Sequence, residues 1–475
     1  MKRIIAHLLK EAMMKKRSLT VIMSMIMAGT LLAGCGSSSS SSSSGASTTS
    51  GETTAAAAET TATTAAATES SSDGEKISLT VPTWVGYGQE QIDTANAKDG
   101  GPAYDDNYYI AVAASIAKDY PEYDVNYADW GWAESLDAKQ RSLFAAGNAP
   151  DVVAGETFIP SYANEGLLEP LPQDIIDSVN PTYLCYDPDG NPVAVAYKTS
   201  IFMLFYNKDL LSKAGLDPDT PPTTWDEFKE MSDKITAAGN GEFYGGGIPS
   251  FPHAGGALRA TPFFRMNGTD FAVDGKQNLT DPKLQEVLQF IRDMNANFPE
   301  GLGNGTDESP LWDAFKKGQF AFAINGTWQE AESTNAGMNW GVAPLPTKDG
   351  STKGNCTVGT VYLAVPKDAQ HKDASFNIIR ECLKQENEEL WLKGSYAPAL
   401  NSILDDESKY ADDVALKAEV SELKAGTYSG LATFSKNDSS IWEIVDQQVL
   451  QRTTMTNDDI ATICSDAASQ ISSLE

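Results

Sequence analysis

The side chains that could carry out catalysis form no recognised catalytic motif in this sequence. The motifs HExxH, GxxxxGK[ST], GxSxG and GxGxxG are all absent. Of the three histidines, His7 lies near the N-terminus, His371 precedes a predicted helix, and His253 lies in a turn-rich stretch where it is a candidate ligand contact. Acidic residues are so frequent that a glycosidase pair of carboxylates stays open as an alternative. The sequence therefore favours a binding protein without metal or cofactor over an enzyme.

Tryptophan and tyrosine residues are found instead in loop-like settings, beside Gly, Ser, Thr and Asn. They are Trp84, Tyr87, Trp130, Trp132, Trp328, Tyr362, Trp391, Tyr396 and Trp442. Aromatic faces next to hydrogen-bonding side chains suit sugars, whose C–H faces are apolar and whose edges carry hydroxyls. Any one of these rings alone is typical of a core, but the group predicts a carbohydrate site. Trp225, Trp312 and Trp340 are assigned to structure.

The elements that must position these rings alternate between strand-like and helix-like patterns, which predicts an α/β fold. Residues 77–81 and 320–324 alternate as strands do. A capping box at 224–227 begins a helix that ends near Gly239, and Asp281-Pro282 and Ser309-Pro310 begin two more. We also expect helices after Asp373 and over residues 457–474.

Length and charge limit the class of protein. The predicted body from residue 75 onward is too long for one core and suits two. After residue 34 the chain has 29 basic and 64 acidic residues, so it should be repelled by nucleic acid and by anionic lipid. Cys185, Cys356, Cys382 and Cys464 share no metal-binding spacing, and they are expected to be buried thiols, with one disulfide as an alternative.

The N-terminal region has the pattern of an export signal. Basic residues 15–17 precede a short apolar run over 19–32, which is the arrangement of a secretory signal; translation is expected to start at Met13 or Met14. Leu32-Ala33-Gly34-Cys35 resembles a bacterial lipobox, in which Cys35 becomes the lipidated first residue. Residues 36–73 are mostly Ser, Thr, Ala and Gly and should form a disordered tether about 30–40 Å long. We therefore predict a signal at 1–34, a lipidated tether at 35–74 and a location on the extracytoplasmic face of the cell membrane.

Several segments of the body match one family in order and spacing. They are residues 145–153 (AAGNAPDVV), 165–171 (EGLLEPL), 204–211 (LFYNKDLL), 214–216 (AGL), 221–228 (PPTTWDEF), 318–328 (GQFAFAINGTW) and 340–346 (WGVAPLP). With these segments the chain resembles the maltose-binding-like solute-binding proteins of bacterial ABC importers. The stretch 88–107 is longer than in the family, so a substrate cannot be transferred from any one relative.

The resemblance implies two α/β lobes that close on a ligand in the cleft between them. It places crossings between lobes near Tyr197, Thr360 and Gln385. The first lobe would then hold residues 75–197 and 360–385, and the second lobe would hold residues 198–359 and 386–475.

The resemblance also implies ligand contacts. It adds Glu156 and Thr157 to the aromatic candidates, and it supports the loop from Trp84 to Tyr87, Trp328 and Trp442. Arg259 and Arg265 lie in a segment that contributes contacts in the family, although salt bridging is the alternative for both.

These observations together predict a lipid-anchored, monomeric receptor that captures an oligosaccharide and delivers it to an ABC permease. Three kinds of alternative stay open, and the first is a sensory or adhesive surface protein that binds a solute without a transporter. The second is a surface glycoside hydrolase, and the third is a binding protein for a polyol, a peptide or a sugar phosphate.

Overall fold

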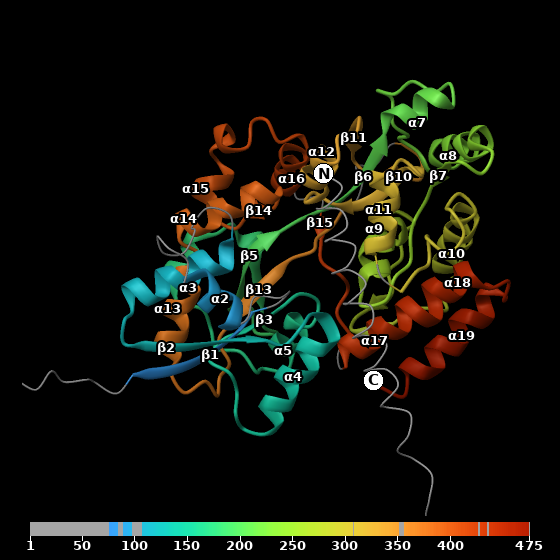
Figure 1. Ribbon diagram of the computed structural model, residues 1–475. Coiled ribbons are helices and arrows are strands. Elements are labelled where there is room, and N and C mark those ends of the chain that lie inside the picture. The colour runs from blue at the N-terminus through green and yellow to red at the C-terminus, as the bar shows by residue number, and fades with distance from the viewer. Residues whose placement is uncertain are drawn as a thin grey trace, which may run out of the picture. The chain divides into compact units, whose positions relative to one another are not determined.

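The computed structural model describes residues 76–83, 89–96, 107–306, 308–350, 356–425, 428–434 and 437–474 (Figure 1). These residues all belong to one compact unit, 72–475. The predicted signal, Cys35, the tether, Trp84 and Tyr87 lie outside the described residues. None of the described helices combines the length and the apolar composition that a membrane span requires.

A first lobe is built on the sheet β14-β5-β13-β3. Its strands are β3 (Val153–Gly155), β5 (Pro192–Thr199), β13 (Val361–Ala364) and β14 (Ala397–Pro398), with β4 (Leu184–Tyr186) paired to β5. The parallel pair β1 (Ile77–Thr83) and β2 (Tyr123–Asp129) lies beside this sheet. It is linked to the sheet by Thr80 of β1, which donates its N–H at 2.7 Å to the carboxylate of Asp151, just before β3. The helices of this lobe are α2 (Gln89–Asn96), α3 (Tyr108–Asp119), α4 (Ala133–Ala145), α5 (Ile159–Asn164), α6 (Gln173–Ser178), α13 (Lys372–Cys382), α14 (Gln385–Glu388), α15 (Asn401–Leu404) and α16 (Val414–Ala425).

A second lobe is built on the sheet β11-β6-β10-β7. Its strands are β6 (Phe202–Asn207), β7 (Tyr244–Gly246), β10 (Phe320–Gly326) and β11 (Trp340–Ala343). All seven residues of β10 are buried, because the strand is central and is covered on both faces. The helices are α7 (Lys208–Lys213), α8 (Trp225–Gly239), α9 (Gly255–Met266), α10 (Pro282–Asn295), α11 (Ser309–Lys316), α12 (Gln329–Asn335), α17 (Asp438–Ile444), α18 (Arg452–Met455) and α19 (Ile460–Ile471), and a π-helical turn, η4 (Val445–Gln451), links α17 to α18.

The predicted helix signals are confirmed at most ends. Thr224 and Glu227 form both halves of the capping box of α8, and Asp281 caps α10. Two of the predicted helix starts differ from the structure by two or three residues. His371 rather than Asp373 is the residue before α13, and α19 begins at Ile460 behind its cap Asp459, three residues after the predicted start. The four cysteines of the body are buried free thiols, as expected.

Three segments cross between the lobes side by side (Figure 1). The first joins β5 to β6, and the second runs from β12 (Cys356–Thr357) to β13; Ser200 and Gly359 exchange backbone hydrogen bonds of 2.8 and 3.3 Å between them. The third is β15 (Tyr428–Ser429), which pairs in parallel with β12. The predicted crossing near Gln385 therefore needs correction, because β14 still pairs with β5 of the first lobe and buried residues of the chain return to the second core only at Phe434.

Candidate functional site

A cavity of about 550 Å³ lies between the lobes, next to the crossing segments. Its lining residues come from both sheets and from α9 and the loops around it. They are Trp132, Glu156, Lys198, Ser200, Phe202, Phe251, Pro252, His253, Gly255, Leu258, Arg259, Thr306, Glu308, Trp328, Gly359, Val361 and Tyr396. The volume is within the range of small-molecule sites, about 300–1,000 Å³.

One wall of the cavity is aromatic. Trp328, at the start of α12, and Tyr396, just before β14, lie with ring centroids 5.7 Å apart and planes inclined by 21°. The Trp328 ring also meets the edge of Phe202 at 5.7 Å, and it lies against Gly326, where a Cβ would come within 1.8 Å of the indole. This glycine is therefore required for the position of the Trp328 ring. Trp132 adds a further half-buried ring from the first lobe.

Charged side chains face the same cavity. The Lys198 ammonium lies 4.4 Å from the ring centroids of both Trp391 and Tyr396. Burial lowers the pKa of Lys198 to about 8, and the nearby Glu156 opposes that change. Burial likewise raises the pKa of Glu156 to about 7, with Lys198 opposing it. The pKa values of Glu156 and Lys198, about 7 and about 8, therefore both lie close to neutral pH.

Arg259 of α9 is held rigidly at the cavity wall. Its guanidinium donates to the Ile324 carbonyl at 3.1 Å, the Gly255 carbonyl at 2.8 Å and the Asn325 side chain at 2.7 Å, and it pairs with Glu308. Its side chain is only 2% exposed, so the ion pair with Glu308 forms part of the wall. This network also fixes α9 against β10, because the arginine links the two elements directly.

Of the residues considered from the sequence, Trp132, Glu156, His253, Arg259 and Trp328 line this cavity. Thr157 lines two small neighbouring cavities, and Tyr362 lines one of them. The structure thus brings together the loop after β3, the end of β10 and the crossing segments around this cavity.

Three of the predicted tryptophans, Trp130, Trp391 and Trp442, do not line the cavity. Trp391 is buried behind Lys198 and Tyr396, which line the cavity, while Trp442 is 1% exposed between Phe271 and Phe434. Trp130 faces Lys139 outside the cavity.

Arg265 has the alternative role considered from the sequence. It donates to Asp270 and to the Gly430 carbonyl, both at 2.7 Å, and it does not line the cavity. Salt bridging at the end of α9 is the role that the structure gives this residue.

Sequence reasoning missed Lys198, Phe202 and Glu308, and it did not select Tyr396 from the aromatic group. Lys198 carried a usable signal, because it is a single charge directly after the apolar run 193–197. Glu308 carried none, since its position depends on Arg259, which lies 49 residues earlier in the chain.

Comparison with known proteins shows the family of this chain. The family profile described as bacterial extracellular solute-binding protein matches residues 101–385. The maltotriose-binding protein of Pyrococcus abyssi is 26% identical over 317 residues, which cover 62% of this chain and 65% of that protein. The sn-glycerol-3-phosphate-binding periplasmic protein of Brucella abortus is 28% identical over 184 residues, which cover 38% of this chain and 41% of that protein. The matches thus span less than two thirds of these relatives.

Solved structures share the fold over most of their length. A maltose-bound protein of Thermotoga maritima superposes with a TM-score of 0.67 at 21% identity, over 83% of this chain and 99% of that chain. A Listeria monocytogenes ABC substrate-binding protein in complex with cycloalternan gives 0.66 at 19% identity, over 84% and 98%. Since the two-lobe fold agrees and the family profile covers more than half of the sequence, this chain belongs to the bacterial extracellular solute-binding proteins.

Proposed function

We propose that this protein is the solute receptor of an ABC importer and binds a carbohydrate, most simply an oligosaccharide, in the cavity between its lobes. The observation that supports this best is the pair of rings, Trp328 and Tyr396, on a cavity that also presents Lys198 and Glu156. Such a surface offers apolar contact to a sugar face and hydrogen bonds to its hydroxyls. The relative named as a maltotriose-binding protein points to the same ligand class.

The balance of charge favours a neutral ligand over a sugar phosphate. Lys198 and Arg259 line the cavity together with Glu156 and Glu308, so the positive and negative side chains are equal in number. The Arg259 guanidinium is already paired with Glu308 and with three other acceptors. A phosphate would have to compete with these partners and would face two carboxylates, so it would gain little.

Lobe closure supplies the signal to a permease in this proposal. One contact between the lobes is the hydrogen bond of 2.6 Å that Ser439 of α17 donates to Asp137 of α4, and others join α12 to the start of α16, where Glu330 accepts from the Val414 and Ala415 N–H groups. A solute that contacts both lobes stabilises the closed form by its differential affinity for that form. No turnover of the solute is involved.

A thermal-shift screen against mono- and oligosaccharides tests the ligand class. A ligand that binds only the folded protein raises the free energy of unfolding by RT ln(1 + [L]/Kd), about 2.7 kcal/mol at a hundredfold excess over Kd. We expect a rise in Tm with one glycan series. Sugar phosphates, polyols and peptides serve as the matched panel, and shifts confined to that panel would overturn the carbohydrate assignment.

We further propose that Cys35 carries a lipid that anchors the protein to the cell membrane. The Leu-Ala-Gly-Cys sequence and the low-complexity stretch after it support this anchor. We expect Cys35→Ser to move the protein from the membrane fraction to the soluble fraction, and mass spectrometry of the wild-type N-terminal peptide should find a diacylglyceryl cysteine. Cys464→Ser is the control. An unlipidated wild-type peptide beginning before Cys35 would contradict the anchor.

A further inference from the structure

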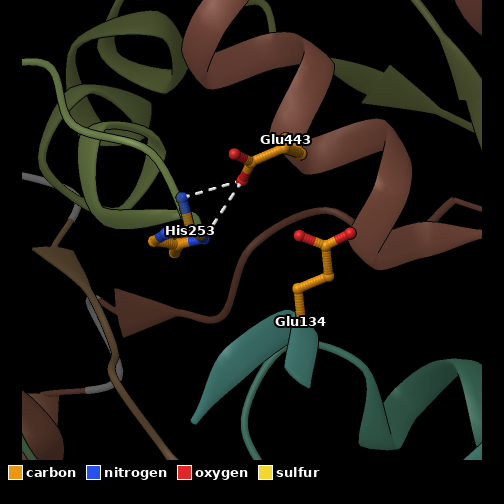
Figure 2. A group of neighbouring side chains, drawn as sticks. All are labelled: Glu134, His253 and Glu443. Carbon is orange, nitrogen blue, oxygen red and sulfur yellow. Dashed lines mark hydrogen bonds and ion pairs between the residues drawn. The ribbon is translucent and has the colours of Figure 1, made fainter. Parts of the chain in front are cut away.

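Three potential metal ligands come together where the two lobes meet, at the edge of the cavity. They are Glu134 of α4 in the first lobe, and His253 and Glu443 in the second lobe, with Glu443 on α17 (Figure 2). One ligand atom from each lies within 4.8 Å of the others. Among the described residues, no other three His, Cys, Asp or Glu side chains bring their ligand atoms this close together.

The second-lobe half of the group is already organised. Glu443 accepts a hydrogen bond of 3.0 Å from the His253 backbone N–H, and its carboxylate lies 3.4 Å from His253 Nδ1. The Gln447 amide, one turn later, donates to the other Glu443 oxygen. Partners that fix a ligating carboxylate from outside the ligand set are typical of metal sites. The Glu443 side chain is 19% exposed and the imidazole 55%, so an ion can enter from solvent.

The first-lobe half faces this pair across the gap. In Figure 2 the Glu134 carboxylate, at the start of α4, points toward Glu443 and His253. No Lys or Arg among the described residues forms an ion pair with Glu134 or Glu443. Two carboxylates that approach from opposite lobes repel each other, so they oppose closure unless a cation lies between them.

We propose that Glu134, His253 and Glu443 bind a divalent zinc-class cation that bridges the two lobes. Two carboxylates and one imidazole suit Zn²⁺, which takes His nitrogen and carboxylate oxygen at about 2.0–2.2 Å and leaves a fourth position for water. Ligands at that distance lie roughly 3.4 Å apart in a tetrahedral site, so modest rotation of the exposed Glu134 and His253 side chains closes the set.

The bridge has a functional consequence that rests on the proposed solute-receptor function. His253 is at once a metal ligand and a lining residue of the cavity. A cation that joins the lobes favours the closed form, and a solute that favours the closed form tightens the cation site by the same factor. The ion would therefore raise solute affinity without touching the solute.

Titration calorimetry of the metal-free protein with Zn²⁺ alone tests the site. We expect one equivalent to bind, with affinity reduced more than tenfold in Glu443→Gln and in His253→Gln. Gln447→Leu should lose only about tenfold, because it keeps all three ligands and removes only the supporting hydrogen bond. His371→Gln is the matched control, since His371 is the other described histidine and is exposed next to α13. Wild-type binding no tighter than that of His253→Gln would overturn the site.

Glu134→Gln separates a bridge from a site confined to one lobe. It removes the single first-lobe ligand, so Zn²⁺ should still bind weakly to His253 and Glu443 but should no longer close the lobes. Small-angle X-ray scattering should show a smaller radius of gyration with Zn²⁺ in the wild type and no change in Glu134→Gln. Equal zinc affinity and equal compaction in both would overturn the bridge. Because neither measurement uses a solute, a failed sugar screen would leave this inference standing, and a failed zinc titration would leave the receptor function standing.

Discussion

Trp328→Ala is expected to lower the affinity for the carbohydrate by at least about thirtyfold. The half-buried indole lines the cavity, lies parallel to Tyr396 and contacts the edge of Phe202, so it presents a fixed apolar face. Removing a large, preorganised aromatic contact at the centre of a site typically costs 2 kcal/mol or more, which is about thirtyfold in Kd. Calorimetric titration with the sugar identified by the thermal-shift screen measures the change.

Two companion variants make this result specific. Trp130→Ala removes a tryptophan of the first lobe that lies outside the cavity lining, and it should leave Kd within about twofold of wild type. Trp328→Phe keeps a smaller face and should fall between wild type and Trp328→Ala. The Tm of each variant without ligand shows whether the fold is kept. If Trp328→Ala and Trp130→Ala lose the same affinity at equal Tm, the ring does not contact the ligand.

The fold was largely predictable because its signals are local. The capping box of α8, the Asp-Pro start of α10 and the apolar alternation of β10 each depend on a few neighbouring residues, and the structure forms all three elements there. The third lobe crossing was placed about 40 residues too early for the opposite reason. It depends on the pairing of β14 with β5, which lies some 200 residues earlier in the chain, and no local pattern encodes that pairing.

The site was predictable only where it coincides with such local patterns. Trp328 follows a strand end, and Glu156 follows the short strand β3, so both could be selected from sequence order. Trp391 and Trp442 also have polar residues close by in the sequence, as Trp328 has, yet both are buried. Whether a loop tryptophan faces a cavity or a core depends on the packing of the two lobes, which is not readable from the neighbouring residues. The zinc-class cluster was missed for the same reason, since Glu134, His253 and Glu443 have no motif spacing.

Stability should fall as pH rises from about 5 to about 8, because several buried carboxyl groups keep their protons in the folded state. Burial, aided by Asp137 across the lobe contact, raises the pKa of Asp438 from 3.8 to about 8. Burial raises the pKa of Glu156 to about 7 and those of Glu388, Glu419 and Asp446 well above the ordinary range. The unfolded chain releases these protons near pH 4. Between pH 4 and the raised pKa the folded state thus binds more protons, so the free energy of unfolding decreases with pH.

Asp438→Asn should remove one part of this slope, up to about 1.4 kcal/mol per pH unit. Asp438 Oδ1 accepts from the Phe434 N–H at 2.7 Å, and Asn can keep that bond while carrying no charge at any pH. The variant should therefore match wild type near pH 4 and be more stable at pH 8, as measured by urea denaturation at each pH. Asp189→Asn, in an exposed turn, should follow the wild-type curve. If Asp438→Asn also follows that curve, Asp438 is ionised in the folded protein, and the negative charges of Asp137 and Asp438 would then oppose each other across the lobe contact in the closed form.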